Sequence, residues 1–273
     1  MSDNTKKDRS PKFSWKLYAG ILILLAAGVF AKVPTFILVE ELAQKPQVWG
    51  RVFLFIFIEQ FLIFGVIPAG LGLFLMFRMG LQIPILENWL LGESHEVDLW
   101  KLLQESLIFS LGLAVIGVAV QLLIEQDLNA LGLDVGQNLQ SNAPTTWWSM
   151  LLLSFSAGIV EEIVFRLGLL TFLAWGVNWL WKPRGGQLKP SAFWVVNILS
   201  ALFFALAHFV NYSALDISLT FGLIWKTIVG NSLAALVFGW LYWKRGLGSA
   251  MLAHFLLDVW IYVLVPPLLV SFT

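Results

Sequence analysis

Residues 149–177 read SMLLLSFSAGIVEEIVFRLGLLTFLAWGV, an apolar run that contains Glu161, Glu162 and Arg166. About 20 predominantly apolar residues are enough to cross a lipid bilayer as a helix. Each ionised side chain at the centre of a bilayer costs about 2.5–3.5 kcal/mol on insertion scales, so such groups usually face protein or water and serve a function. The run therefore predicts a membrane helix that carries part of a functional site.

The composition of the whole chain indicates a protein that crosses the membrane several times. Of the 273 residues, 59% are hydrophobic and 12% are charged, whereas roughly 25% are charged in soluble domains. Mean hydropathy is +0.81. The formal net charge is zero, so nothing points to nucleic acid as a partner. The chain has no Cys, which excludes disulfides, thiolate catalysis and Cys-based metal sites. The predicted fold class is all-α, a polytopic transmembrane helical bundle.

Seven apolar stretches predict seven spans, and eight stay open because the fourth stretch is too long for one simple crossing. The stretches lie at about 15–31, 52–77, 101–124, 147–181, 191–210, 227–243 and 247–265. Gly168 and Gly176 are candidate bend positions in the fourth stretch. Residues 1–14 are expected to form a polar, basic tail, and residues 15–273 a single integral membrane domain. The first stretch lacks a clear small-residue cleavage site, so it is interpreted as a retained helix.

The distribution of Lys and Arg predicts a cytoplasmic N-terminus, because cytoplasmic loops carry an excess of these residues. In this orientation three cations lie outside, namely Lys32, Lys45 and Arg51. Twelve lie inside: Lys6, Lys7, Arg9, Lys12, Lys16, Arg78, Lys101, Lys182, Arg184, Lys189, Lys244 and Arg245. The predicted location is the lipid bilayer of the plasma (inner) membrane.

The charged residues of the fourth stretch are related by helical geometry. Glu162 and Arg166 are four residues apart and share a helix face, so they can form an ion pair that makes both tolerable in the membrane. Glu161 projects roughly a quarter turn away and is left to face a site. A second Glu pair, Glu40 and Glu41, lies in a short polar segment with no Arg four residues on. Two adjacent Glu residues therefore carry no functional meaning by themselves.

Two of the three histidines lie in strongly apolar stretches, whereas His95 lies in the polar segment GESHEVD and is interpreted as solvated. His254 and Asp258 are four residues apart and share one face of the last span. His208 must come from the fifth span. A single histidine in a membrane helix often only bonds a neighbouring helix, so the combination carries the functional interpretation. The candidate site joins the fourth, fifth and last spans.

Three motifs in this region resemble those of the CAAX-processing and bacteriocin-processing family of intramembrane proteases, which contains the type II CAAX prenyl endopeptidases. EEIVFR at 161–166 is similar to the family's EExxxR motif, and FALAH at 204–208 to its FxxxH motif. HFLLD at 254–258 resembles its third motif, a His followed four residues later by Asn or Asp. The resemblance covers about 145–265, the protease-like core.

The resemblance implies a membrane endopeptidase whose catalytic residues lie between helices. It implies that Glu161 is the catalytic carboxylate, that His208 helps it to activate water, and that His254 and Asp258 hold the oxyanion. Three further residues would support the site structurally: Glu162, Arg166 and Phe204. A carboxylate in a low-dielectric cavity is a better general base near neutral pH, and an imidazole N–H aimed at an oxyanion stabilises developing charge.

Position 258 leaves the mechanism open. Asn could donate a hydrogen bond to an oxyanion, whereas an ionised Asp258 would repel it. Either Asp258 is protonated, or it orients His254, or the site holds a divalent metal. Two His and a carboxylate form a known catalytic zinc set, so Glu161, His208 and His254 are possible zinc ligands. The expected cofactor is therefore either none or one divalent metal.

The expected partner is a membrane-associated peptide or protein substrate, either of the CAAX type or a bacteriocin-like precursor. Two other functions stay open on the residues alone. One is a non-enzymatic membrane protein of the same fold with an immunity or assembly role. The other is a proton-coupled transporter, since intramembrane Glu, His and Asp also form proton relays. The chain shows no internal repeat of the kind that many transporters contain.

Overall fold

The structure is a computed structural model that describes residues 13–37, 50, 54–130, 146–181, 188–214, 219 and 221–265. Within these ranges the chain is helical and contains no strand, which confirms the all-α prediction. Most of the predicted tail at 1–14 lies outside the described residues. So do Glu40 and Glu41.

The described part of the chain forms a series of helical segments. They are α1 (Trp15–Ala31), α2 (Val33–Ile37), η1 (Phe55–Val66), α5 (Ile67–Met76), η2 (Phe77–Met79), α6 (Pro84–Leu91), α7 (Leu99–Ala130), α9 (Trp147–Glu162), η3 (Ile163–Leu170), α10 (Thr171–Trp181), α11 (Pro190–Ala214), α12 (Phe221–Arg245), α13 (Leu247–Asp258) and η4 (Val259–Leu264). η1, η3 and η4 are π-helical, and η2 is a 3₁₀ turn.

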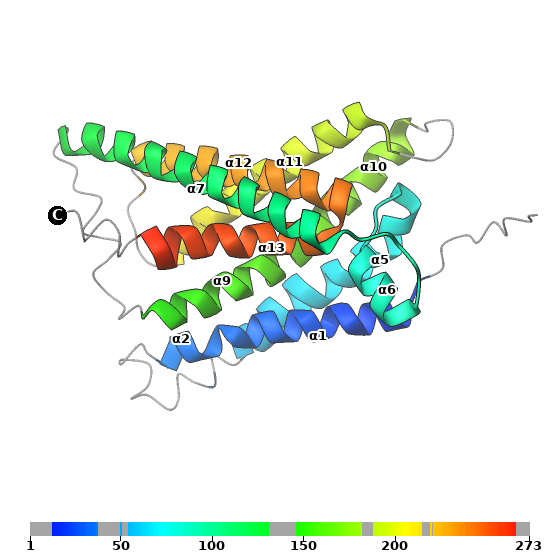
Figure 1. The fold of residues 1–273 in the computed structure, drawn as a ribbon. Helices are drawn as coiled ribbons and strands as arrows, with labels where there is room; N and C mark the ends of the chain where they lie inside the picture. Colours follow the sequence, from blue (N-terminus) through cyan, green and yellow to red (C-terminus); the bar gives the residue numbers. More distant parts are fainter. Residues whose placement is uncertain are drawn as a thin grey trace, which may run out of the picture.

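The long helices run side by side along one direction, with α9 and α13 at the centre (Figure 1). α13 packs against α7, α12 and α9, and α12 packs against α11. On the other side α9 packs against α1, and α5 packs against η3. α6 lies at one end of the bundle, next to the first residues of α7 and the last turn of α12 (Figure 1). We call this the α6 end.

Within the described residues, six helices are long and apolar enough to cross a membrane. They are Trp15–Thr35, Gln60–Met79, Leu99–Val120, Pro190–Val210, Phe221–Arg245 and Leu247–Leu264. Each overlaps one of the seven predicted spans. The remaining predicted span, 147–181, is helical throughout as α9, η3 and α10 but is not among the six.

One boundary of the predicted spans differs from the structure. α12, the sixth predicted span, begins at Phe221 rather than at about 227. Gly168, a candidate bend position, lies in the π-helical segment η3, through which the helical path continues from α9 into α10. Its missing side chain allows close packing, since a Cβ at Gly168 would lie 2.6 Å from Cβ of Pro68.

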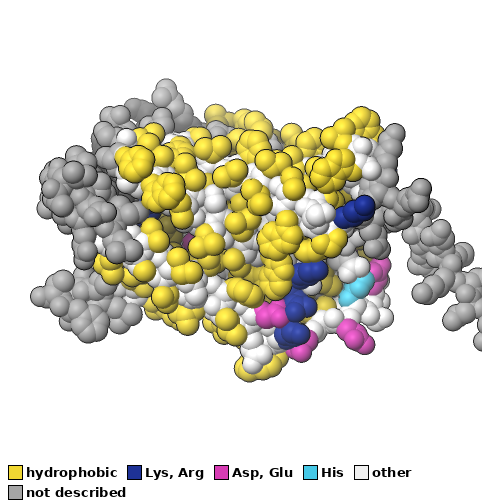
Figure 2. Space-filling model, turned by 90° about the horizontal axis from the view of Figure 1, so that it is seen from above, with side chains coloured by type: hydrophobic (Ala, Val, Ile, Leu, Met, Phe, Trp, Pro, Cys, Tyr) yellow, Lys and Arg dark blue, Asp and Glu magenta, His cyan; other side chains and the backbone are white. Residues whose placement is uncertain are grey.

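The surface agrees with a membrane protein. One face of the bundle is covered largely by hydrophobic side chains, and charged side chains gather toward one end of it (Figure 2). Exposed large hydrophobic residues occur on most of the long helices, including Ile108 on α7 and Val210 on α11. Apolar atoms facing outward over this area are stable in lipid rather than in water.

A sharp turn sets the central helix in place. Gly246 has φ of 90°, a conformation that side-chain-bearing residues rarely adopt, and it separates the end of α12 from the start of α13. Next to this turn, Arg245 donates two hydrogen bonds to the Glu105 carboxylate of α7, at 2.6 and 2.7 Å. α7, α12 and α13 are therefore tied together at the α6 end.

Candidate active site

The predicted site residues lie where α9 and α13 meet. Glu161 and Glu162 are the last two residues of α9, and Asp258 is the last residue of α13. Each helix then continues as a π-helical segment, η3 or η4. π-Turns inside helices are often found at functional sites, because they redirect side chains locally. Both carboxylate-bearing helix ends have this feature.

Close contact between α9 and α13 requires Gly158. A Cβ at this position would lie 2.9 Å from the Met251 carbonyl oxygen and 3.0 Å from Cβ of Phe255. Backbone atoms cannot move aside as a flexible side chain can. The absence of a side chain at Gly158 therefore allows the end of α9 to reach the histidine of α13.

The expected ion pair within the EEIVFR segment is present. Nη1 of Arg166 lies 2.9 Å from Oε1 of Glu162, and both side chains are buried. Arg166 also donates a hydrogen bond from Nη2 to the Ala235 carbonyl of α12, at 3.4 Å. A buried charge is tolerated when it is paired and hydrogen-bonded, so Arg166 makes the buried Glu162 carboxylate possible.

Glu162 also contacts the histidine of the last motif. Oε1 of Glu162 lies 2.7 Å from Nδ1 of His254. A carboxylate paired with Arg accepts hydrogen bonds and does not donate them, so Nδ1 of His254 carries the proton. Glu162, rather than Asp258, therefore fixes the orientation of this imidazole. From the sequence alone, Asp258 is the residue predicted for that role.

The other ring nitrogen of His254 faces the two remaining carboxylates. Nε2 lies 3.9 Å from Oε2 of Glu161 and 3.8 Å from Oδ2 of Asp258. Both separations are too long for a hydrogen bond. Glu161 is 29% exposed and Asp258 15% exposed, whereas His254 is almost fully buried. The space beside Nε2 is thus bordered by two carboxylates, one of which is partly accessible.

Aromatic rings enclose the charged groups. Phe238 of α12 stacks on the His254 ring at 4.8 Å between centroids, with 17° between the planes. Phe204 of α11 meets the same ring edge-on at 6.0 Å. The Arg166 guanidinium lies over both phenyl rings, 4.6 Å from Phe204 and 5.4 Å from Phe238. These contacts favour a cation at Arg166 and hold the His254 ring in one plane.

Among the described residues, His208 is connected to the other site residues through Phe204. Its ring lies 4.8 Å from the Phe204 ring, and its Nδ1 lies 2.8 Å from the Phe204 carbonyl oxygen. A carbonyl only accepts, so Nδ1 donates and Nε2 is free to accept a hydrogen bond. His208 has no ion pair with Glu161 or Asp258 in the described structure. Three of the four predicted catalytic residues are therefore brought together, and the fourth lies beside them.

The possible zinc ligands do not form a compact set in this arrangement. Within the described part of the chain, the group of three His or carboxylate ligand atoms mutually within 4.8 Å is Glu87, Glu93 and His95, at the α6 end. Glu161, His208 and His254 do not meet that criterion. Zinc at the predicted catalytic residues stays a prediction.

Sequence reasoning did not identify three of the groups around the site. Phe238 and the Ala235 carbonyl lie on α12, which carries no motif. Lys32, at the end of α1, interacts electrostatically with Glu161. Its Nζ lies 3.5 Å from Oε1 of Gln60. Its signal in the sequence was weak, because a cation beside a predicted span end is usually assigned to the membrane surface.

The motif-bearing region also matches a known protein family. Residues 143–260 match the family model described as type II CAAX prenyl endopeptidase Rce1-like. This part of the chain is therefore similar to that family. The matched segment contains all the site residues of α9, η3, α11 and α13. No curated protein and no solved structure matches the chain.

The family match supports a general class of activity. The family is one of proteases, which supports an intramembrane endopeptidase at the level of the family. The six apolar helices agree with an integral membrane protein. The Rce1-like segment ends at 260, so it includes His254 and Asp258 but only the start of η4.

Proposed function

We propose that the protein is an intramembrane endopeptidase that hydrolyses a peptide bond in a membrane-associated CAAX-type substrate, with Glu161 as the general base. One observation carries the proposal. Nε2 of His254 faces Glu161 and Asp258 at 3.9 and 3.8 Å, while Nδ1 of the same ring is held by Glu162. A partly exposed carboxylate thus lies beside an oriented imidazole, as water-mediated acyl transfer requires.

The proposed first step is attack by water on the scissile carbonyl carbon. Glu161 accepts one proton from the water, the water oxygen forms the new C–O bond, and the carbonyl oxygen becomes an oxyanion. The imidazolium of His254 donates a hydrogen bond from Nε2–H to that oxyanion. This bond stabilises negative charge that is absent from the uncleaved substrate. The tetrahedral intermediate then breaks its C–N bond, and the proton on Glu161 passes to the leaving amine.

The proposed role of Asp258 concerns His254. Together with Glu161 and Glu162 it surrounds His254 with carboxylates, and these favour the charged imidazolium. Asp258 therefore acts through His254. His208 acts on the water: with Nδ1–H donated to the Phe204 carbonyl, its Nε2 lone pair can accept a hydrogen bond from the attacking water.

The proposed orientation has a cytoplasmic N-terminus, with the α6 end at the cytoplasmic surface. Lys101, Lys244 and Arg245 all lie at this end around one cavity. The excess of Lys and Arg at one end supports this assignment. We also propose the plasma membrane as the location.

The test uses purified protein in lipid nanodiscs and a farnesylated peptide that ends in a CAAX sequence, with products identified by mass spectrometry. Glu161→Gln is expected to lower the cleavage rate by about 10³-fold or more, since general-base catalysis alone contributes about 10²–10⁴-fold. Glu96→Gln is the control, because Glu96 lies in the 92–98 segment away from these residues. Cleavage by Glu161→Gln at the wild-type rate would remove Glu161 from the mechanism.

A chelator distinguishes the two forms of the mechanism. Activity that survives removal of divalent metals and is unchanged by added Zn²⁺ supports the metal-free scheme. Activity that is lost and then restored by Zn²⁺ supports a metal held by Glu161, His208 and His254, in which the metal would supply Lewis-acid polarisation.

A further inference from the structure

A second group of ionisable side chains lies at the α6 end, apart from the candidate active site. It consists of Glu87 on α6 and of Glu93 and His95 in the 92–98 segment that follows. Nε2 of His95 lies 2.9 Å from Oε2 of Glu87 and 2.8 Å from Oε2 of Glu93. The ligand atoms of all three residues lie within 4.8 Å of one another. We call these residues the EEH cluster.

The hydrogen bonds of the EEH cluster do not account for its geometry. Nε2 of His95 can carry one proton, and its hydrogen bond goes to Glu93. Oε2 of Glu87 is buried, faces the same nitrogen and has no hydrogen-bond partner. Buried polar atoms without a partner are uncommon in native proteins and often mark a missing ion or water. The unpartnered atom is directed into the cluster.

The charges of the EEH cluster are also unbalanced without a further cation. Two carboxylates face one imidazole, and Glu87 is only 1% exposed. A divalent cation bound by two carboxylates and a neutral imidazole would bring the net charge to zero.

The backbone around the cluster holds the three side chains in position. The Ile83 N–H donates to Oε1 of Glu87 at 3.3 Å, which leaves Oε2 directed toward His95. The Asn88 side chain binds both the N–H and the carbonyl of His95, each at 2.8 Å. Gly92, with φ of 67°, ends α6 and turns the chain back. Segment 92–98 therefore folds back so that His95 lies beside α6.

We propose that Glu87, Glu93 and His95 bind one divalent cation of the zinc class. Zn–N and Zn–O bonds of about 2.1 Å place two ligand atoms about 3.0 Å apart at a right angle and about 3.4 Å apart at the tetrahedral angle. The observed separations of 2.8 and 2.9 Å need only a small outward movement of the half-buried His95 ring. A nitrogen ligand favours zinc over Mg²⁺ or Ca²⁺, which prefer oxygen.

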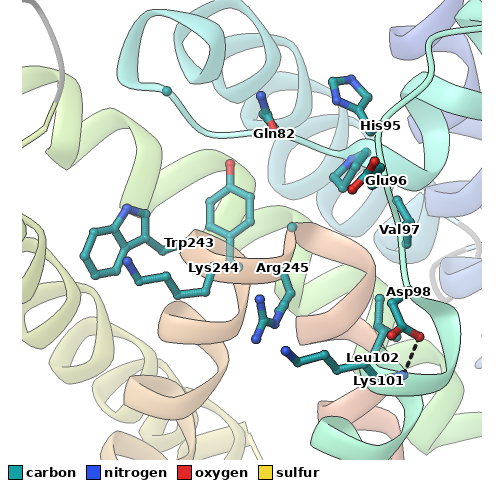
Figure 3. A pocket seen from close by; sticks show the side chains of 14 residues that line it. Gln82, His95, Glu96, Val97, Asp98, Lys101, Leu102, Trp243, Lys244 and Arg245 are labelled. Carbon is teal, nitrogen blue, oxygen red and sulfur yellow. Dashed lines mark hydrogen bonds between the residues drawn. The ribbon is translucent and has the colours of Figure 1, made fainter.

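The ion has a route to this site. His95 lines a cavity of about 460 Å³ that also contacts Lys101 and Arg245 (Figure 3). In Figure 3 the His95 and Glu96 side chains lie on the α6 side of this cavity. The cavity can supply the water ligands that complete the coordination sphere of a three-residue site. The bound ion would fix segment 92–98 to α6 where the bundle meets the membrane surface.

The test is zinc binding by untagged, full-length protein in lipid nanodiscs after treatment with a chelator. Isothermal titration with Zn²⁺ is combined with metal counting by mass spectrometry. Wild type and Glu96→Gln are expected to bind one equivalent at the cluster. His95→Ala and Glu93→Gln are expected to weaken that binding by about 100-fold or more, because even outer-shell changes cost about 10–100-fold. Glu93 is half-exposed, so its substitution leaves folding intact.

Three results would overturn the proposal. The first is no zinc binding by the wild type, and the second is unchanged binding by His95→Ala and Glu93→Gln. The third is binding that is lost in His254→Ala and kept in His95→Ala, which would place the ion at the candidate active site. Cobalt substitution gives an independent check, because the visible spectrum of Co²⁺ changes when it gains a nitrogen ligand from His95. The outcome does not depend on whether the protein cleaves peptides.

Discussion

Oε1 of Glu162 lies 2.7 Å from Nδ1 of His254, although 92 residues separate them in the chain. The same oxygen lies 2.9 Å from Nη1 of Arg166. Glu162, on α9, therefore sets the orientation of the His254 imidazole on α13. In the proposed mechanism the second Glu of the EEIVFR segment positions the imidazole, and the first is the general base.

Glu162→Gln is expected to lower kcat by about 10²-fold or more with little change in KM. The loss of a carboxylate that orients a catalytic imidazole can cost up to about 10⁴-fold in hydrolases. A change in kcat at constant KM indicates an interaction that matters in the transition state. Steady-state cleavage of the farnesylated peptide measures both constants. A rise in KM alone would show that Glu162 serves substrate binding instead.

Arg166→Met is expected to lower the free energy of unfolding by up to about 3–5 kcal/mol, because it leaves the buried Glu162 carboxylate without its guanidinium partner. The double variant Glu162→Gln with Arg166→Met should recover most of that stability, since two neutral groups replace a buried pair. Its activity should stay as low as that of Glu162→Gln. Unfolding in mixed micelles and peptide cleavage give the two readouts. Equal stability of the single and double variants would contradict the pairing.

Phe204→Leu is expected to lower activity about tenfold. Phe204 contacts the rings of both His208 and His254 and lies under the Arg166 guanidinium. A cation–π contact with a desolvated cation contributes about 2 kcal/mol, and Leu cannot make it. Phe203→Leu is the matched control, because the neighbouring Phe203 is 52% exposed on the outer face of the same helix. Similar losses in both variants would indicate a general packing effect.

Tyr242→Phe is expected to lower the free energy of unfolding by about 1 kcal/mol, the usual net value of a buried hydrogen bond. Thr171 donates its hydroxyl proton to the Arg166 carbonyl, so the Tyr242 hydroxyl donates to Oγ1 of Thr171, at 3.0 Å. This bond links α12 to α10 behind the ion pair. Unfolding measurements at constant lipid composition test the change. An unchanged stability would mean that the tyrosine hydroxyl finds another partner.

Local spacing was enough to predict the features that lie within one helix. The four-residue separations of Glu162 from Arg166 and of His254 from Asp258 place each pair on one face, and the structure has both arrangements. Apolar length likewise located six of the helices. These predictions succeed because they depend only on helical geometry and on burial in lipid.

Contacts between helices could not be predicted in the same way. The bond from His254 to Glu162 depends on the register of α13 against α9, and that register follows from packing at Gly158. The polar segment around His95 predicts a solvated side chain, whereas Gly92 and Asn88 place His95 beside α6. Such contacts arise from turns and side-chain packing, which no single stretch of sequence specifies.

Gly158→Ala is expected to lower kcat about tenfold or more while the protein stays folded. The added methyl group meets the Met251 carbonyl oxygen and the Phe255 backbone nitrogen, so α9 and α13 must separate by a few tenths of an ångström. That movement lengthens the Glu162–His254 bond and shifts Glu161 relative to Nε2. Misplacement of a catalytic group by about 1 Å can cost about 10²-fold. Gly176→Ala is the matched control, because a Cβ at Gly176 meets no atom within 4 Å. Wild-type kcat in Gly158→Ala would show that the activity tolerates a wider separation of α9 and α13 than the proposed geometry allows.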